Sequence, residues 1–175
     1  MSTVVSRDAL EKIASDAAIN AGLDPVDIKC IIEQESSWDQ WAWNPEPAYK
    51  YLVNVQTKKP FRQLTVQERI SEIPPADFPV IAGDRDQEWW AQQSSWGLMQ
   101  VMGGAARESG FTGPYLPALL DPSLNVLIGC QWFLKKLRLA GQDLQKALLF
   151  WNGGGDKSYP AKVMARRSNY ITGVL

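Results

Sequence analysis

Helix start and stop signals recur along this chain and constrain its fold more than any other feature. Asp24-Pro25 and Asp121-Pro122 each place a capping side chain directly before a proline, a pair that opens helices. Gly22 and Gly141 stand where helices should end. Apolar residues between these signals follow the helical period, and no alternating strand pattern persists for long. The sequence therefore predicts an all-α or mainly α fold.

The same signals divide the chain into a helical scaffold and one long stretch of different character. The expected helices cover residues 7–21, 24–36, 103–109, 121–140, 143–151 and 158–172. Residues 39–94 are instead rich in Trp, Pro and Asp, with only a short helix expected near 65–72. We therefore expect a single domain over residues 1–175, interrupted by a long irregular insert at about 39–94.

Composition removes several classes of function. Hydrophobic residues make up 45% of the chain and charged residues 21%, as in a globular protein with a core. The net charge of −1 offers no clustered basic excess for nucleic acid. No apolar run approaches the roughly 20 residues of a membrane span. The N-terminus lacks the basic and apolar segments of a secretory signal, so we expect the product to be made in the cytoplasm and, if exported, to cross by another route.

The absence of histidine narrows the chemistry further. It argues against a Ser-His-Asp triad, a Cys-His nucleophile and the His-containing zinc sites of peptidases. Cys30 and Cys130 lie far apart and form no CxxC pair, so we expect two buried free thiols. No metal or cofactor is implied. Carboxylates, tyrosines and backbone amides remain as catalytic groups.

One carboxylate stands on an apolar helix face. Ile28, Ile31, Ile32 and Glu35 recur at helical spacing, whereas Glu33 lies roughly 200° around the helix from Glu35. Burial and the negative end of the helix dipole should both raise the pKa of Glu35. A carboxyl that stays protonated near neutral pH can act as a general acid. From position alone, an ordinary exposed glutamate at a helix end remains the alternative.

Four motifs in order carry a family resemblance. The segments QESSW, SSWGLMQVM, LLFWNGGG and YPAKVMARRSNY together resemble the soluble lytic transglycosylase family. The resemblance covers about residues 24–38 and 94–173. It implies the lysozyme-like helical fold that the family shares with goose-type lysozymes, and it assigns the role of catalytic acid/base to Glu35. It also implies that substrate binds at the residues matching its ES and GLMQ elements, namely Ser36, Gly97, Leu98, Met99 and Gln100.

The chain departs from the family pattern at two places. Trp151 stands before Asn152 where the family has a tyrosine, and an indole N–H can donate a hydrogen bond but not accept one. Tyr159 matches a later family tyrosine, so we expect it to supply the hydroxyl near Glu35, with Trp151 and Asn152 beside the groove. The second departure is the long insert, which is similar to those of some phage and prophage members and hints at a viral origin.

Aromatic residues concentrate in and beside the insert. Six of the eight tryptophans fall here: Trp38, Trp41, Trp43, Trp89, Trp90 and Trp96. Indole rings suit the apolar faces of sugars, so the insert would wall a glycan groove; alternatively, these rings form a small core of their own. On the long helix at 121–140 we assign Trp132, Phe133 and Leu137 to the core.

The resemblance implies a specific reaction on peptidoglycan glycan strands. Glu35 would cleave the β-1,4 bond between N-acetylmuramic acid and N-acetylglucosamine, acting first as acid and then as base, and leave 1,6-anhydro ends. Two alternatives remain open. A goose-type muramidase on the same fold would need a second carboxylate, for which Glu46, Asp84 and Asp86 are candidates. A catalytically inactive wall-binding part of a virion or secretion machine would need no catalytic carboxylate. In each case we expect the protein to act at the bacterial wall in the periplasm.

Overall fold

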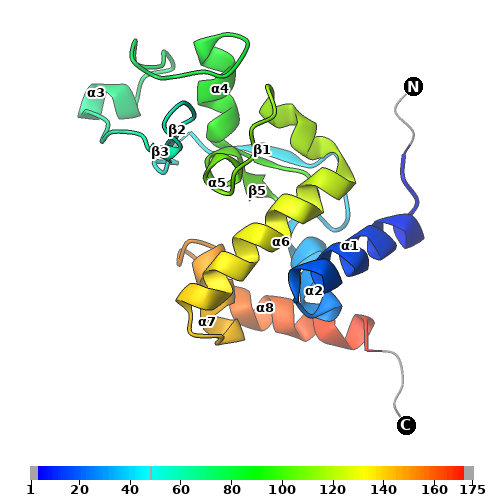
Figure 1. Cartoon of the computed structure of the whole chain (residues 1–175). Helices are drawn as coiled ribbons and strands as arrows, with labels where there is room; N and C mark the ends of the chain where they lie inside the picture. Colours follow the sequence, from blue (N-terminus) through cyan, green and yellow to red (C-terminus); the bar gives the residue numbers. More distant parts are fainter. Residues whose placement is uncertain (1–3, 48, 172–175) are drawn as a thin grey trace.

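The computed structural model describes residues 4–47 and 49–171, and helices dominate these ranges (Figure 1). The α-helices are α1 (Arg7–Ala21), α2 (Pro25–Glu35), α3 (Val66–Arg69), α4 (Arg85–Gln92), α5 (Gly103–Glu108), α6 (Pro122–Leu139), α7 (Leu144–Trp151) and α8 (Tyr159–Ala165). Two 3-10 helices, η1 (Leu116–Leu120) and η2 (Arg166–Asn169), and five strands of two or three residues accompany them. The prediction of a mainly α fold is confirmed.

The capping residues lie where the sequence predicts them. Asp24 accepts a hydrogen bond from the backbone N–H of Val26 at 2.8 Å, and Asp121 accepts one from Leu124 at 2.8 Å. Each such cap stabilises its helix by about 0.5–2 kcal/mol. The final helix is shorter than expected, because α8 ends at Ala165 and the chain tightens into η2. The expected end at Thr172 lies outside the described residues.

The core gathers around α6, which runs through the middle of the molecule and packs against α1 and α7 (Figure 1). α2 packs between α1 and α8 and buries Ile28, Ile31 and Ile32 completely. The two cysteines are free and buried in this core, as predicted. Burial raises the pKa of Cys30 to about 11 and that of Cys130 to about 12, so both remain unreactive thiols at neutral pH.

A small antiparallel sheet faces the end of α2. Its strands are ordered β1 (Trp43–Pro45), β4 (Ser94–Trp96) and β5 (Val101–Met102). The register pairs Asn44 with Ser95, and Ser95 with Met102, so these side chains share one face of the sheet. The turn between β4 and β5 is the GLMQ segment. Strands this short show no alternating pattern, so sequence periodicity missed them.

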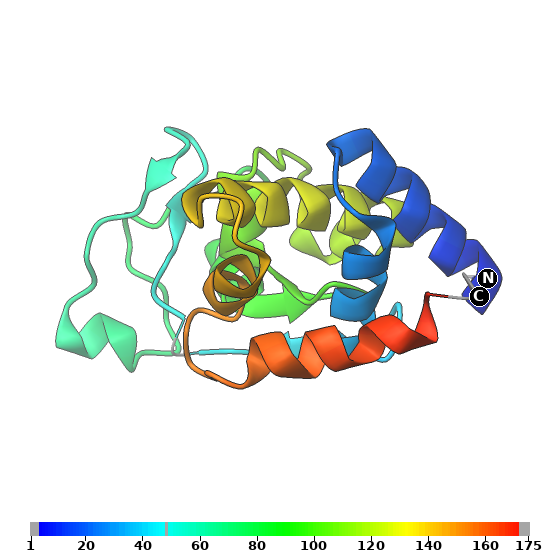
Figure 2. The ribbon, with the colours of Figure 1, turned by 90° about the horizontal axis from the view of Figure 1, so that it is seen from below.

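The insert is more ordered than predicted. Besides α3, it contains α4 and the two-stranded ribbon of β2 (Val53–Asn54) and β3 (Lys59–Pro60), while its first residues supply β1. A separate hydrophobic cluster of Leu52, Phe78 and Trp89 holds it together. Figures 1 and 2 show the insert projecting from one end of the molecule, opposite the start of α1 and the end of η2. The insert is irregular over most of its length, as expected, but β1 and α4 add regular structure near its two ends that the sequence did not predict.

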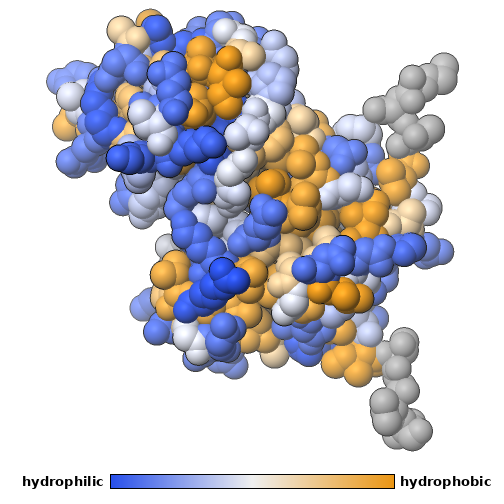
Figure 3. Space-filling model, in the orientation of Figure 1, coloured by the Kyte–Doolittle hydropathy of each residue, from blue (hydrophilic) through white to orange (hydrophobic). Residues whose placement is uncertain are grey.

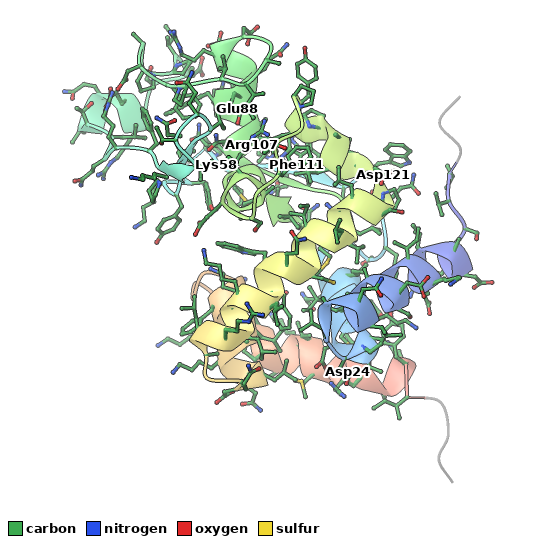
Figure 4. All side chains as sticks on the ribbon, viewed as in Figure 1. Asp24, Lys58, Glu88, Arg107, Phe111 and Asp121 are labelled. Carbon is green, nitrogen blue, oxygen red and sulfur yellow. The ribbon has the colours of Figure 1, made fainter. Side chains whose placement is uncertain are left out.

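A buried ion pair fixes the insert to the helical scaffold. Glu88 of α4 and Arg107 of α5 lie side by side (Figure 4), joined by two hydrogen bonds of 2.8 and 2.7 Å. Both side chains are almost completely buried. Arg107 also donates to the carbonyls of Phe111 and Gly113, so every part of the pair has a partner. This satisfies the condition under which a buried charge pair is tolerated.

Candidate active site

Glu35 is the last residue of α2 and continues its buried apolar face. Two donors from the C-terminal part of the chain converge on its carboxyl. The Tyr159 hydroxyl donates to Oε1 at 2.5 Å, and the Trp151 indole N–H donates to the same oxygen at 2.8 Å. The expectation that Tyr159 stands beside Glu35 is therefore correct, and Trp151, which replaces the family tyrosine, joins it there.

The surroundings favour the protonated form of Glu35. Burial is the largest cause and raises its pKa above the ordinary value, while the hydrogen bonds from Tyr159 and Trp151 lower it by smaller amounts. The negative charge of Glu46 raises the pKa further. Burial also raises the pKa of the Tyr159 hydroxyl far above its usual range, so this group remains a donor at all working pH values.

The two carboxyl oxygens have different environments. Oε1 receives both hydrogen bonds, whereas Oε2 has no partner among the described residues. An oxygen that accepts two hydrogen bonds is the carbonyl-like oxygen of a neutral carboxyl. This arrangement favours Oε2 as the oxygen that carries the acid proton.

Glu35 opens into a cavity of about 600 Å³ between the insert and the helices. One wall comes from the sheet and the adjoining insert, and the other comes from α6, α7 and the loop that follows α7 at Asn152 and Gly153. The lining residues are Glu35, Asn44, Glu46, Tyr49, Tyr51, Ser95, Gln100, Val101, Met102, Trp132, Trp151, Asn152 and Gly153. Figure 3 shows the outline of the molecule indented between the insert above and α7 below. A cavity with Tyr and Trp rings beside polar groups suits a sugar chain.

Only part of the predicted substrate-binding set reaches this cavity. Gln100, Trp151 and Asn152 line it together with Glu35. Gln100 donates to the carbonyl of Ala42 at 3.1 Å and accepts from the Ser95 hydroxyl at 2.9 Å, which fixes its side chain in the wall. Tyr159 is buried behind Glu35 and acts on the carboxyl rather than on the cavity surface.

The rest of the GLMQ element supports the wall from behind. Leu98 and Met99 are fully buried in the core, so the structure corrects their assignment as groove-lining residues. Gly97 is also buried; it has a φ of +63°, and a Cβ there would stand 2.7 Å from the carbonyl oxygen of Leu119. Asn125 of α6 holds the turn by accepting from the N–H of Met99 at 2.8 Å. This element is a tight turn that aims Gln100 at the cavity.

Ser36 also has a supporting position. Its hydroxyl donates to the carbonyl of Leu98 at 2.8 Å and accepts from the N–H of Trp38 at 3.1 Å. The bond to Leu98 ties the end of α2, where Glu35 lies, to the turn that contains Gln100. Ser36 does not line the cavity, contrary to its assignment to substrate binding.

Comparison with known protein families agrees with this arrangement. A profile of the Transglycosylase SLT domain matches residues 12–169. The chain belongs to this family. The SLT domain indicates that the chain acts on peptidoglycan. A search of curated proteins finds no match.

Sequence reasoning missed several residues in the cavity of this SLT domain. Trp132 packs against the main core, as predicted, but it also lines the cavity, which its position on α6 did not indicate. Phe133 itself is buried in the core, and Leu137 packs against it, as predicted. Tyr49 and Tyr51 come from the insert, where no periodic signal marked them.

The tryptophans of the insert do not line the cavity of the SLT domain. Trp89 lies in the small cluster of the insert, and Trp38 and Trp96 belong to the main core. Trp41 is exposed. Trp43, Trp90 and Trp96 border a separate cavity of about 490 Å³ next to the opposite face of the sheet. These rings therefore do not share the cavity of Glu35, and the strand pleat turns Trp43 away from Asn44, which lines it.

Other candidate groups have simpler explanations. Of the three possible second carboxylates, only Glu46 lines the cavity; Asp84 caps α4 by accepting from the N–H of Gln87 at 2.7 Å. Asp86 is in the exposed first turn of α4. Within residues 4–47 and 49–171, no group of three His, Cys, Asp or Glu side chains is placed to hold a metal ion. None of the helices in these ranges is long and apolar enough to cross a membrane.

Proposed function

We propose that this chain is a lytic transglycosylase that cleaves the β-1,4 bond between N-acetylmuramic acid and N-acetylglucosamine in peptidoglycan. The observation that carries the proposal is the state of Glu35. Its side chain is half-buried, its pKa is raised, and Oε1 accepts from two donors while Oε2 has no partner among the described residues. A single carboxyl held in this way is an acid ready for a glycosidic oxygen.

The proposed reaction balances without water. Glu35 donates its proton to the bridging oxygen, and the bond from that oxygen to C1 of the muramic residue breaks. The acetamido oxygen of the same residue bonds to C1 and gives an oxazolinium ion. Glu35, now a carboxylate, takes the proton of the muramic 6-hydroxyl, whose oxygen bonds to C1 as the acetamido oxygen leaves. The products are a free 4-hydroxyl on N-acetylglucosamine and a 1,6-anhydro end on the muramic residue.

The hydrogen bonds at Oε1 suit both steps. They keep the carboxyl in one orientation while it is neutral, which places the proton of Oε2 toward the cavity. They strengthen when Glu35 becomes charged, because hydrogen bonds to ions are about twice as strong as neutral ones. Tyr159 and Trp151 therefore stabilise the carboxylate that forms after the first step.

A variant of the acid itself tests the proposal. Glu35→Gln keeps both hydrogen bonds at Oε1 but has no proton to give, so lysis of purified sacculi should fall by about 10²–10⁴-fold. Glu33→Gln is the matched control on the same helix. Glu33 faces Arg166 and Tyr170 instead of the cavity, so this variant should still lyse sacculi. Wild-type lysis rates from the Glu35 variant would refute the assignment.

A hydrolase on the same scaffold is the second candidate, because Glu46 lines the same cavity and acts electrostatically on Glu35. A carboxylate across the sugar from the acid can activate water for direct displacement. Mass spectrometry of the released fragments separates the two reactions, since hydrolysis adds one water and transglycosylation adds none. We expect anhydro products, and we expect Glu46→Gln to leave their identity unchanged. Reducing muramic ends that disappear in this variant would favour the hydrolase.

The remaining candidate is a wall-binding part of a virion or secretion machine without chemistry. Such a protein would sediment with sacculi and release no soluble fragments. The same digestion therefore decides this case, because any product that depends on Glu35 excludes it. Association with a virion is a separate proposal, supported only by the likeness of the insert to those of phage members.

A further inference from the structure

A second cavity lies in the insert next to the catalytic one. It has a volume of about 410 Å³, and residues 50–53, residues 60–64, Arg69 and Glu108 line it. Tyr51 lines both cavities and forms a shared wall. On the α6 side, Lys135 pairs with Glu108 and lies near the ring of Trp132, which lines the catalytic cavity. The insert cavity is thus a lateral neighbour of the site where the proposed cleavage takes place.

The two cavities differ in charge. The catalytic cavity contains the carboxyls of Glu35 and Glu46 and no cation. The insert cavity contains Lys50 and Arg69, which form no ion pair among the described residues, while Lys135 balances its one carboxylate, Glu108. Its third cation, Arg62, is held by Glu68 and Asp77 at 2.7 Å each. Two uncompensated cations therefore face the insert cavity, which favours an anionic ligand.

The walls between these cations are apolar. Leu52 and Val53 are buried, and Phe61 and Leu64 pack against the cluster beneath them. A ligand that fits must therefore combine carboxylates with small apolar groups. Neutral N-acetyl sugars lack the charge, and inorganic phosphate lacks the apolar part.

We propose that the insert cavity binds the peptide stem of peptidoglycan. The inference rests on the proposed function, because the stem is attached through the lactyl group of the muramic residue that Glu35 would cleave. A stem carries free carboxylates and methyl side chains, which match Lys50, Arg69 and the apolar walls. The insert cavity would then make recognition depend on peptide-bearing strands, while the catalytic cavity binds the glycan.

Binding to two forms of the same polymer tests the proposal. The Glu35→Gln chain serves as the parent protein, because it binds strands without cutting them. Its affinity is measured for soluble glycan strands that carry peptide stems and for strands stripped of stems by an amidase. Two exposed charge contacts contribute enough to predict a roughly 2- to 30-fold preference for the peptide-bearing strands at low salt. The preference should shrink as salt is added.

Variants assign the preference to this cavity. Lys50→Ala combined with Arg69→Ala should reduce the ratio of the two affinities to about one. Lys59→Ala is the matched control, since Lys59 is an exposed cation of the same insert that does not line the cavity. Circular dichroism checks that each variant is folded. A parent ratio near one, or a full ratio in the double variant, would overturn the proposal.

The outcome is independent of the catalytic assignment. The binding ratio is measured without cleavage, whereas the anhydro product is measured with the wild-type chain. Anhydro products without a peptide preference would reject the insert site and keep the proposed function. A peptide preference without anhydro products would keep the insert site and reject the proposed function.

Discussion

Tyr159→Phe removes one hydroxyl and leaves the ring that fills the site. The lost bond is the 2.5 Å contact with Oε1 of Glu35, while the Trp151 N–H remains on the same oxygen at 2.8 Å. A hydrogen bond to a charged group contributes about 1.5–3 kcal/mol. If that energy acts on the carboxylate formed during the reaction, the rate should fall roughly 10- to 150-fold.

The pH dependence gives a second readout. The Tyr159 hydrogen bond lowers the pKa of Glu35, so its removal should raise that pKa further. Activity requires the protonated acid and declines as pH rises through this pKa. The alkaline limb of the rate profile should therefore move to higher pH in Tyr159→Phe, although the maximal rate is lower. A purely structural role for Tyr159 would reduce activity without moving the limb.

Tyr170→Phe is the matched control. Its hydroxyl donates to Glu33, the other carboxylate in the last turn of α2, which faces away from the cavity. This variant should change thermal stability but not the position of the alkaline limb. Rates would be followed by the release of soluble fragments from purified sacculi between acid and alkaline pH. A Tyr159→Phe enzyme with the wild-type limb and more than half of the wild-type rate would refute the reasoning.

Three further predictions follow from the burial and bonding of particular side chains. The folded state disfavours the ionised form of Glu35, because burial raises the pKa of its carboxyl. The stabilising contribution of this residue is therefore present in acid and is lost as pH rises through the raised pKa. Glu35→Gln should raise the melting temperature by about 2–4 °C at neutral pH and leave it unchanged in acid. Ser36→Ala removes the bond to the Leu98 carbonyl and should cost about 0.5–1.5 kcal/mol in urea unfolding, together with a loss of rate. Arg107→Met leaves the carboxylate of Glu88 buried without a partner and should cost about 3–5 kcal/mol, and a loss below about 1 kcal/mol would contradict the burial described.

Local signals in the sequence predicted the scaffold well. Capping aspartates and terminal glycines act within a few residues of the helix end, so Asp24 and Asp121 marked α2 and α6 to within about one residue. The apolar face of α2 likewise located Glu35, because the spacing of apolar residues within one helix is enough to indicate which face is buried. The small sheet and α4 were missed, since their formation depends on contacts between segments far apart in the chain.

The cavity was harder to predict than the acid. Motif positions named Leu98 and Met99 as substrate contacts, yet tertiary packing turns both into the core and leaves only Gln100 at the surface. Trp132 packs against the core as predicted, yet it also lines the cavity, because helical periodicity does not reveal which half-buried position meets a groove. Tyr49 and Tyr51 belong to an insert without periodicity, and only the folded arrangement brings them opposite α6.

The replacement of the family tyrosine by Trp151 restricts the protonation state of the site. A tyrosine hydroxyl can donate to a carboxylate or accept from a carboxylic acid, whereas an indole N–H only donates. Here Tyr159 and Trp151 both direct a donor to Oε1, so a proton on that oxygen would displace one of two hydrogen bonds. The two bonds therefore favour a proton on Oε2, the oxygen without a described protein partner. The substitution that departs most from the family pattern therefore places a donor-only group at Oε1, which favours an acid proton on Oε2.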